Sequence, residues 1–150
     1  MLKGIYINKW GLLYLMFKVI GTDTYLFELK KFSKQEQDEA SKIPKELAQN
    51  PFIGKPLNYK VLREKKIGGK RIYFLVYDAW SLVLLVATST KKNQQATIEH
   101  LKTNLPEFKR IAEKIFRQVL WNFLLLNHSN CLQIAELSQN LSPVVFLILH

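Results

Sequence analysis

Cysteine, histidine and acidic residues are scarce in this sequence, and each shortage excludes a class of protein. The single cysteine, Cys131, excludes an internal disulfide framework and a zinc site built on cysteines. The three histidines, His100, His128 and His150, show no ligand spacing, so we expect no metal site. Only 12 Asp and Glu stand against 22 Lys and Arg, which gives a formal net charge of +10. Because such a charge attracts anions, nucleic acid or an acidic protein is the expected partner.

Long apolar runs are also missing. No stretch reaches the roughly 20 apolar residues that are needed to cross a bilayer. Near the N-terminus, Asn8, Lys9 and Lys18 interrupt the apolar segment that a secretory signal requires. We therefore expect a cytoplasmic protein with reduced cysteine and no membrane contact. A length of 150 residues is typical of one folded domain with its own core.

Hydrophobic periodicity predicts an α+β fold. An N-terminal strand and a helix hairpin are expected to pack on an antiparallel β-meander, followed by C-terminal helices. Ser33 and Glu36 form a capping-box pattern at the start of the second helix, and Pro44 is expected to kink that helix. The expected strands are Met16–Ile20, Asn58–Lys65, Lys70–Tyr77 and Ser81–Thr88, and the expected helices are Tyr25–Phe32, Lys34–Gln49, Gln94–Leu105 and Glu107–Arg117.

The two ends of the chain differ from this central domain, which we place at residues 16–117. Residues 1–15 lack clear periodicity and are interpreted as an N-terminal extension, with Met16 as an alternative start. Residues 118–150 contain no Lys or Arg and one acid, Glu136. Two interpretations of this apolar tail stay open. Val119–Leu126 and Val144–Leu149 form a helix and a strand that cover the sheet or mediate a dimer, or the tail is non-native sequence that follows a frame change.

The most basic stretch of the chain surrounds a glycine turn. It holds Lys60, Arg63, Lys65, Lys66, Lys70 and Arg71 against a single acid, Glu64. A three-residue loop, Ile67 to Gly69, would pair Lys65 with Arg71 and Arg63 with Tyr73. Opposed residues share a face, so these four side chains would project together, away from Phe74. A two-residue loop would split the set.

Such a group of side chains suits the phosphates of a polyanion, and RNA is the expected ligand. Guanidinium groups bind phosphate oxygens in pairs, and crowded cations lower the pKa of a lysine toward that of a usable base. Tyr73 can stack on a nucleobase, and Lys91 and Lys92 can flank the same surface. The alternative is structural: cations near a hairpin also protect a sheet edge from pairing, Tyr73 can belong to the core, and His100 can be a plain surface residue.

The order of elements and three motifs resemble the RelE/ParE toxin superfamily over residues 16–116. The stretch LREKKIGGKRIYF (Leu62–Phe74) is similar to the family's glycine hairpin. Asn50 to Leu57 resembles the loop between the helix hairpin and the sheet, and Lys91 to Gln94 is similar to the exit from the last strand. The resemblance implies a type II toxin, a cognate antitoxin as partner, and oligomers only with that antitoxin.

RelE-like members cleave mRNA on the ribosome without a metal or other cofactor, and the resemblance carries this expectation to named positions. Arg71 matches the arginine that stabilises the phosphate, and Arg63, Lys65 and Lys66 lie in the basic strand, where one lysine would serve as base. Lys92 matches a basic residue after the last strand. Lys60, Lys66, Lys70, Tyr73 and Lys91 are the expected RNA contacts.

One departure from the family keeps a second function open. RelE-like toxins often carry Tyr or His near the C-terminal helix as a general acid, and only His100 can stand in for it here. The alternatives are a non-catalytic, ParE-like inhibitor of DNA gyrase or an inactive RelE-fold binding protein. A plain RNA-binding domain is a third interpretation, with binding that depends strongly on salt.

Overall fold

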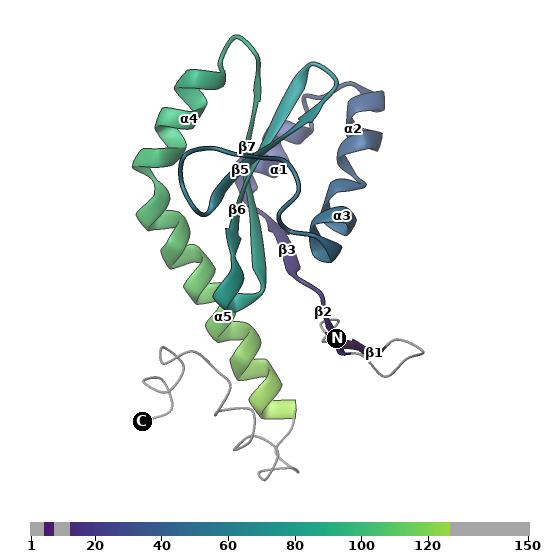
Figure 1. Cartoon of the computed structure of the whole chain (residues 1–150), viewed down its shortest axis with the longest axis vertical. Coiled ribbons are helices and arrows are strands. Elements are labelled where there is room, and N and C mark those ends of the chain that lie inside the picture. Colours follow the sequence, from purple (N-terminus) through teal and green to yellow (C-terminus); the bar gives the residue numbers. More distant parts are fainter. Residues whose placement is uncertain (1–4, 8–12, 127–150) are drawn as a thin grey trace. The chain divides into compact units, whose positions relative to one another are not determined.

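The structure is a computed structural model that describes residues 5–7 and 13–126 (Figure 1). The chain divides into two compact units, Met1–Ala112 and Glu113–His150. The first unit contains the sheet and the helices that pack on it. The predicted limits of the central domain, 16–117, stay a prediction.

A five-stranded sheet organises the first unit, with strand order β3-β7-β6-β5-β4. The outer strand β3 runs parallel to β7, and the remaining neighbours are antiparallel. Its strands are β3 (Lys18–Gly21), β4 (Lys55–Pro56), β5 (Leu62–Ile67), β6 (Lys70–Tyr77) and β7 (Leu82–Thr90). The predicted α+β class and the β-meander are confirmed, and the bounds predicted for β6 are those observed.

Helices cover both faces of this sheet (Figure 1). The hairpin side carries α1 (Asp23–Leu29), α2 (Lys34–Ala40) and α3 (Ile43–Gln49). The opposite side carries α4 (Gln94–Thr103). A 3-10 turn, η1 (Asp78–Trp80), joins β6 to β7, and Ser81 closes it with a positive φ of 46°.

The second predicted helix, Lys34–Gln49, is two helices, so the prediction of one kinked helix is wrong. Pro44 lies in the first turn of α3, where its missing N–H costs no helical hydrogen bond. The capping box is confirmed: Ser33 accepts from the Glu36 N–H at 3.3 Å, and Glu36 Oε2 accepts from the Ser33 N–H at 3.0 Å. The hydrogen bonds that this carboxylate accepts, from the Ser33 backbone N–H first and also from the Ser33 hydroxyl, lower the pKa of the Glu36 carboxyl.

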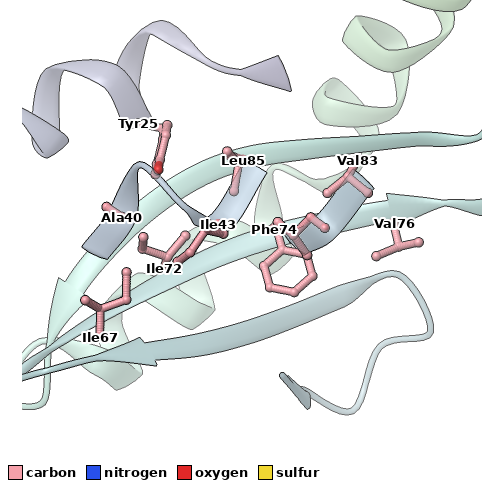
Figure 2. Packing of buried hydrophobic residues seen from close by; sticks show 10 residues of the cluster. Tyr25, Ala40, Ile43, Ile67, Ile72, Phe74, Val76, Val83 and Leu85 are labelled. Carbon is pink, nitrogen blue, oxygen red and sulfur yellow. The ribbon is translucent and has the colours of Figure 1, made fainter. Parts of the chain in front are cut away.

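The core lies between the helix hairpin and the sheet (Figure 2). Ile72, Phe74 and Val76 project from β6 into it, as their alternation predicts. They meet the buried helix residues Tyr25, Ala40, Ile43 and Leu47. Burying such side chains is worth roughly 1.5–3 kcal/mol each, so this layer contributes strongly to stability.

Two local features fix β7 and its neighbours. A β-bulge between Tyr73 and Phe74 leaves Val86 without a partner, because Tyr73 pairs with Ala87 and Phe74 with Leu85. Beyond the end of β3, α1 covers the open edge of β7: Glu28 Oε2 accepts from the Thr88 N–H at 2.5 Å. This contact brings the end of α1 to the Thr90 end of the strand.

The chain outside this core contains three further elements. Strands β1 (Ile5–Ile7) and β2 (Leu13–Leu15) form an antiparallel hairpin, which the sequence did not predict in the N-terminal extension. The last helix, α5 (Leu105–Leu126), is longer than the predicted Glu107–Arg117 and includes the apolar run Val119–Leu126. The predicted strand Val144–Leu149 lies outside the described residues. Within the described part of the chain, no helix is both long and apolar enough to cross a membrane.

Candidate nucleic-acid interface

The turn between β5 and β6 has two residues, so the predicted three-residue loop is wrong. Ile67 pairs with Lys70, and only Gly68 and Gly69 lie between them. Gly68 has a φ of +51°, a conformation that glycine adopts without cost. Lys66 therefore opposes Arg71, and Lys65 opposes Ile72. This shift by one residue reverses which face each basic side chain occupies.

The predicted cluster of four side chains is consequently divided between the two faces. Arg63 opposes Phe74, so it lies on the helix-hairpin face together with Lys65. Arg71 and Tyr73 lie on the α4 face. The premise that Arg63, Lys65, Arg71 and Tyr73 project together is wrong, and their predicted catalytic roles lose that geometric support.

Arg63 is bound by a loop of its own chain. Its Nε donates to the Ile53 carbonyl at 3.2 Å, and its Nη2 donates to the carbonyls of Phe52 and Gly54 at 2.6 and 3.1 Å. The guanidinium also lies 5.9 Å from the centre of the Phe52 ring. Three charge-assisted hydrogen bonds hold the loop before β4, which gives Arg63 a structural role.

Lys65 forms an ion pair with Glu46 of α3, and its side chain is only 26% exposed. The pair lies beside a hollow of about 450 Å³ that is lined by Glu46, Ile53, Gly54, Lys55, Glu64, Lys65 and Lys66. Because the hollow mixes acids with lysines, its lining is not uniformly basic. Gly54 belongs to the same region, and a Cβ at this position would lie 2.4 Å from the Glu64 carbonyl oxygen.

Arg71 lies under α4 in a buried polar cluster. Its Nε is 3.9 Å from Glu64 Oε2, and both side chains are more than nine-tenths buried. Gln94, at the start of α4, donates to the same Glu64 oxygen at 2.9 Å. The buried Arg71 Nε has no hydrogen-bond partner. Its charge is thus balanced mainly by Glu64, an acid that the sequence analysis counted against the cluster without assigning it a role.

Tyr73 lies beside this cluster and is fully buried, with 0% of its surface exposed. Its hydroxyl is 2.8 Å from Ser89 Oγ. Burial, the dominant effect, raises the pKa of the Tyr73 hydroxyl above its ordinary value near 10. The ring is not accessible to a nucleobase in this structure, so Tyr73 has the core role that the sequence left open.

The accessible cations gather at the turn end of the sheet. Lys70 pairs with Thr90 across β6 and β7, which places the Gly68-Gly69 turn and the β7–α4 connection at the same end. Lys66, Lys91 and Lys92 are exposed and have no ion pair among the described side chains. Lys70 is partly exposed, with its Nζ 5.3 Å from the centre of the Phe32 ring. Together these four lysines are an open basic surface.

Two other predicted residues lie away from this surface. Lys60 precedes β5 at the opposite end of that strand and is exposed. His100 is exposed on α4, whereas Ile98 and Leu101 are buried. The amide of Asn104 is 3.3 Å from His100 Nε2. His100 is thus separated from the buried Arg71 cluster by the apolar side of its own helix. In residues 5–7 and 13–126, no three His, Cys, Asp or Glu side chains are grouped as metal ligands.

The fold is RelE-like: an α+β arrangement with a helix hairpin on one face of a mixed sheet. A mutant of the E. coli toxin RelE in its free state matches with a TM-score of 0.52 and 17% identity, over 59% of this chain and 98% of that one. The RelBE2 toxin–antitoxin complex of Mycobacterium tuberculosis matches at a TM-score of 0.46 and 18% identity, over 51% of this chain and 100% of that one. No protein-family model and no curated protein match the sequence.

Several partners in this region were missed by sequence reasoning. The Arg63 acceptors are main-chain carbonyls, which no side-chain motif marks. Gln94 was noted only as part of the strand exit, and Glu46 and Ser89 were not selected. A two-residue Gly-Gly turn was the signal available, because glycines at both central positions are typical of the tight hairpins that join adjacent strands.

Proposed function

We propose that this protein is the toxin of a type II toxin–antitoxin pair, and that it inhibits translation by binding RNA. The observation that carries the proposal is the basic surface of Lys66, Lys70, Lys91 and Lys92 at one end of a RelE-like sheet. Phosphate contacts by lysine supply affinity without requiring a base-specific pocket. A formal net charge of +10 favours encounter with RNA and with the ribosome.

A cognate antitoxin is the proposed protein partner. The supporting structure is described as the toxin RelE, and this chain covers 98% of it. The likeness at 17% identity is one of fold, so the toxin role rests on fold together with the basic surface. An antitoxin would be expected to mask at least part of that surface.

Cleavage of mRNA is a second candidate activity, favoured by one specific observation. Lys66 and Arg71 are directly opposed on the α4 face, so a cation pair remains there after Arg63 and Lys65 are assigned to the other face. In this version Arg71 would stabilise the phosphate charge, and Lys66 or Lys92 would act as base. The burial of Arg71 against Glu64 argues for the non-catalytic version, because the guanidinium already faces an acid.

Inducible expression of the chain, alone and with the reading frame next to its gene, tests the toxin role. We expect growth arrest that the neighbouring frame relieves, and inhibition of translation in a cell-free reaction. Continued growth at a confirmed level of folded protein would overturn the proposal.

Two further measurements separate the activities. Primer extension on translated mRNA detects cleavage, and a supercoiling assay detects gyrase inhibition. Binding without discrete cleavage ends supports the RNA-binding toxin. Cleavage that Lys66→Gln abolishes supports the nuclease. Gyrase inhibition with intact translation overturns the RNA-based proposal in favour of a ParE-like activity.

A further inference from the structure

We propose that the connection between α1 and α2 is a second RNA contact, so that one single strand is held on both sides of the Gly68-Gly69 turn. This inference rests on the proposed function and extends it to residues that the sequence analysis did not select. The contact consists of Lys30, Lys31 and Lys34 together with the aromatic ring of Phe27.

The α1–α2 connection lies at the turn end of the sheet. Lys70 Nζ is 5.3 Å from the centre of the Phe32 ring, which ties the connection to the first residue of β6. The Glu28 carboxylate accepts a hydrogen bond from the Thr88 N–H, which ties the end of α1 to the C-terminal end of β7. Figure 1 shows this connection, the β5–β6 turn and the β7–α4 connection at the same end of the first unit.

Three chain connections therefore contribute lysines to one rim. We call the set the lysine rim, and it comprises Lys30, Lys31, Lys34, Lys66, Lys70, Lys91 and Lys92. The acids near the α2 start already have local partners. Glu36 accepts from Ser33, and Asp38 Oδ1 lies 3.7 Å from Lys34 Nζ on the exposed surface. Such exposed pairs are weak, so Lys34 remains available to a phosphate.

An exposed aromatic ring accompanies these charges. Phe27 is 61% exposed, and Lys31 Nζ lies 4.3 Å from the centre of its ring. Lysines that follow a backbone, together with a ring on which a base can stack, are the features of a surface for single-stranded nucleic acid. The ring favours RNA over an acidic peptide, because a peptide carboxylate gains nothing from stacking.

The geometry of the turn suits a flexible strand. The lysine rim runs from the helix-hairpin face, over the turn, to the α4 face. No atom lies within 4 Å of where a Cβ would stand on Gly68 or Gly69, so the tip is open on both sides. A single strand can bend around such a tip, whereas a straight duplex would reach only one side of it.

The test measures binding of a labelled single-stranded RNA by fluorescence anisotropy over a range of salt concentrations. Each phosphate contact on a single strand contributes about 0.7 to the slope of log K against log salt. Lys30→Gln/Lys31→Gln/Lys34→Gln should therefore lower the slope by about 2. Phe27→Leu should weaken binding roughly tenfold, because it keeps apolar bulk and removes the stacking ring.

A matched control removes three positive charges at other positions of the chain. Lys18→Gln/Lys109→Gln/Arg110→Gln changes Lys18 at the far end of β3 and two residues of α5, and it should leave the slope unchanged. All these positions are exposed, and thermal melting of each variant confirms that the fold is retained.

The possible failures are distinguishable. If the wild-type chain binds no RNA, the RNA-binding part of the proposed function fails as well. If it binds and both triple variants behave alike, the inference about the α1–α2 connection is overturned and the proposed function stands. Equal displacement by polyglutamate, with no effect of Phe27→Leu, overturns the inference in favour of an acidic protein segment.

Discussion

Arg63 and Arg71 extend from opposite faces of one β-hairpin. Arg63 is bonded to the carbonyls of the loop before β4, and Arg71 lies against Glu64 beneath α4. The two guanidinium groups therefore cannot hold one phosphate between them. Each stabilises a different layer of the fold, and the exposed lysines at the turn remain as the groups that are free to contact a ligand.

The separation of structural from exposed cations predicts opposite effects for Arg63 and Lys66. Arg63→Ala removes three hydrogen bonds to loop carbonyls and should lower the free energy of unfolding by about 2 kcal/mol. Lys66→Gln should leave stability within about 0.5 kcal/mol of wild type and weaken RNA binding. Urea denaturation and anisotropy measure the two quantities. A stable Arg63→Ala variant with impaired RNA binding would return Arg63 to the ligand surface.

The buried Arg71–Glu64 pair predicts strong coupling between two substitutions. Arg71→Gln leaves the Glu64 carboxylate buried without its cation, so we expect a loss of about 3 kcal/mol or more. Adding Glu64→Gln removes the unpaired charge and should recover part of that loss. A double-mutant cycle by chemical denaturation measures the coupling. Strictly additive effects would mean that the two side chains do not interact.

Comparing Gly54 with Gly68 separates the cost of a positive φ from the cost of a steric clash. Both have a positive φ, +82° and +51°, but a Cβ at Gly54 would lie 2.4 Å from the Glu64 carbonyl oxygen, and one at Gly68 would meet nothing within 4 Å. Gly68→Ala should cost about 1 kcal/mol from conformation alone. Gly54→Ala should cost at least about 2 kcal/mol more, because β4 must move away from β5. Equal losses in urea denaturation would show that the close approach at Gly54 is not maintained in solution.

Tyr73 predicts a loss of stability at alkaline pH. Burial raises the pKa of its hydroxyl in the folded state, so this hydroxyl stays protonated at a pH at which it ionises in the unfolded chain. Its contribution to the free energy of unfolding is complete below the unfolded pKa near 10 and is lost as the pH rises through the higher folded pKa. Tyr73→Phe should therefore reduce the fall in stability between about pH 9 and about pH 11.

The control for this experiment is Tyr59→Phe, at a ring that is 41% exposed. It should reproduce the alkaline fall of the wild-type chain. Urea midpoints across the pH range are the measurement. If Tyr73→Phe and wild type fall in parallel, ionisation of Tyr73 does not limit alkaline stability.

Local patterns were sufficient to predict the β-meander and the bounds of β6, but not the face of each basic residue. Alternation in β6 identified Ile72, Phe74 and Val76 as core, because burial leaves a period of two in the sequence. The parity between β5 and β6 depends on whether Ile67 belongs to the turn or to the strand. Ile67 is buried in the core, which assigns it to the strand and makes the turn two residues long.

Hydrogen-bond partners that are far apart in the sequence could not be predicted from local patterns. Glu64 and Gln94 are 30 positions apart and meet only after α4 folds back on the sheet. The division of the second helix could have been predicted from Pro44. Proline is favourable in the first turn of a helix, where Pro44 lies in α3, and unfavourable in a helix interior.

The unpaired Val86 has an effect out of proportion to one residue. Upstream of it, odd-numbered residues of β7, such as Val83 and Leu85, belong to the hairpin-side core. Downstream, Ala87 opposes Tyr73, and Ser89 reaches its hydroxyl, so the odd-numbered side chains have changed sides. Removing Val86 itself would leave Ala87 opposite Tyr73 and keep every following side chain up to Thr90 on its present face. Natural variation in the length of this strand should therefore be confined, within Leu82–Thr90, to the bulge at Val86.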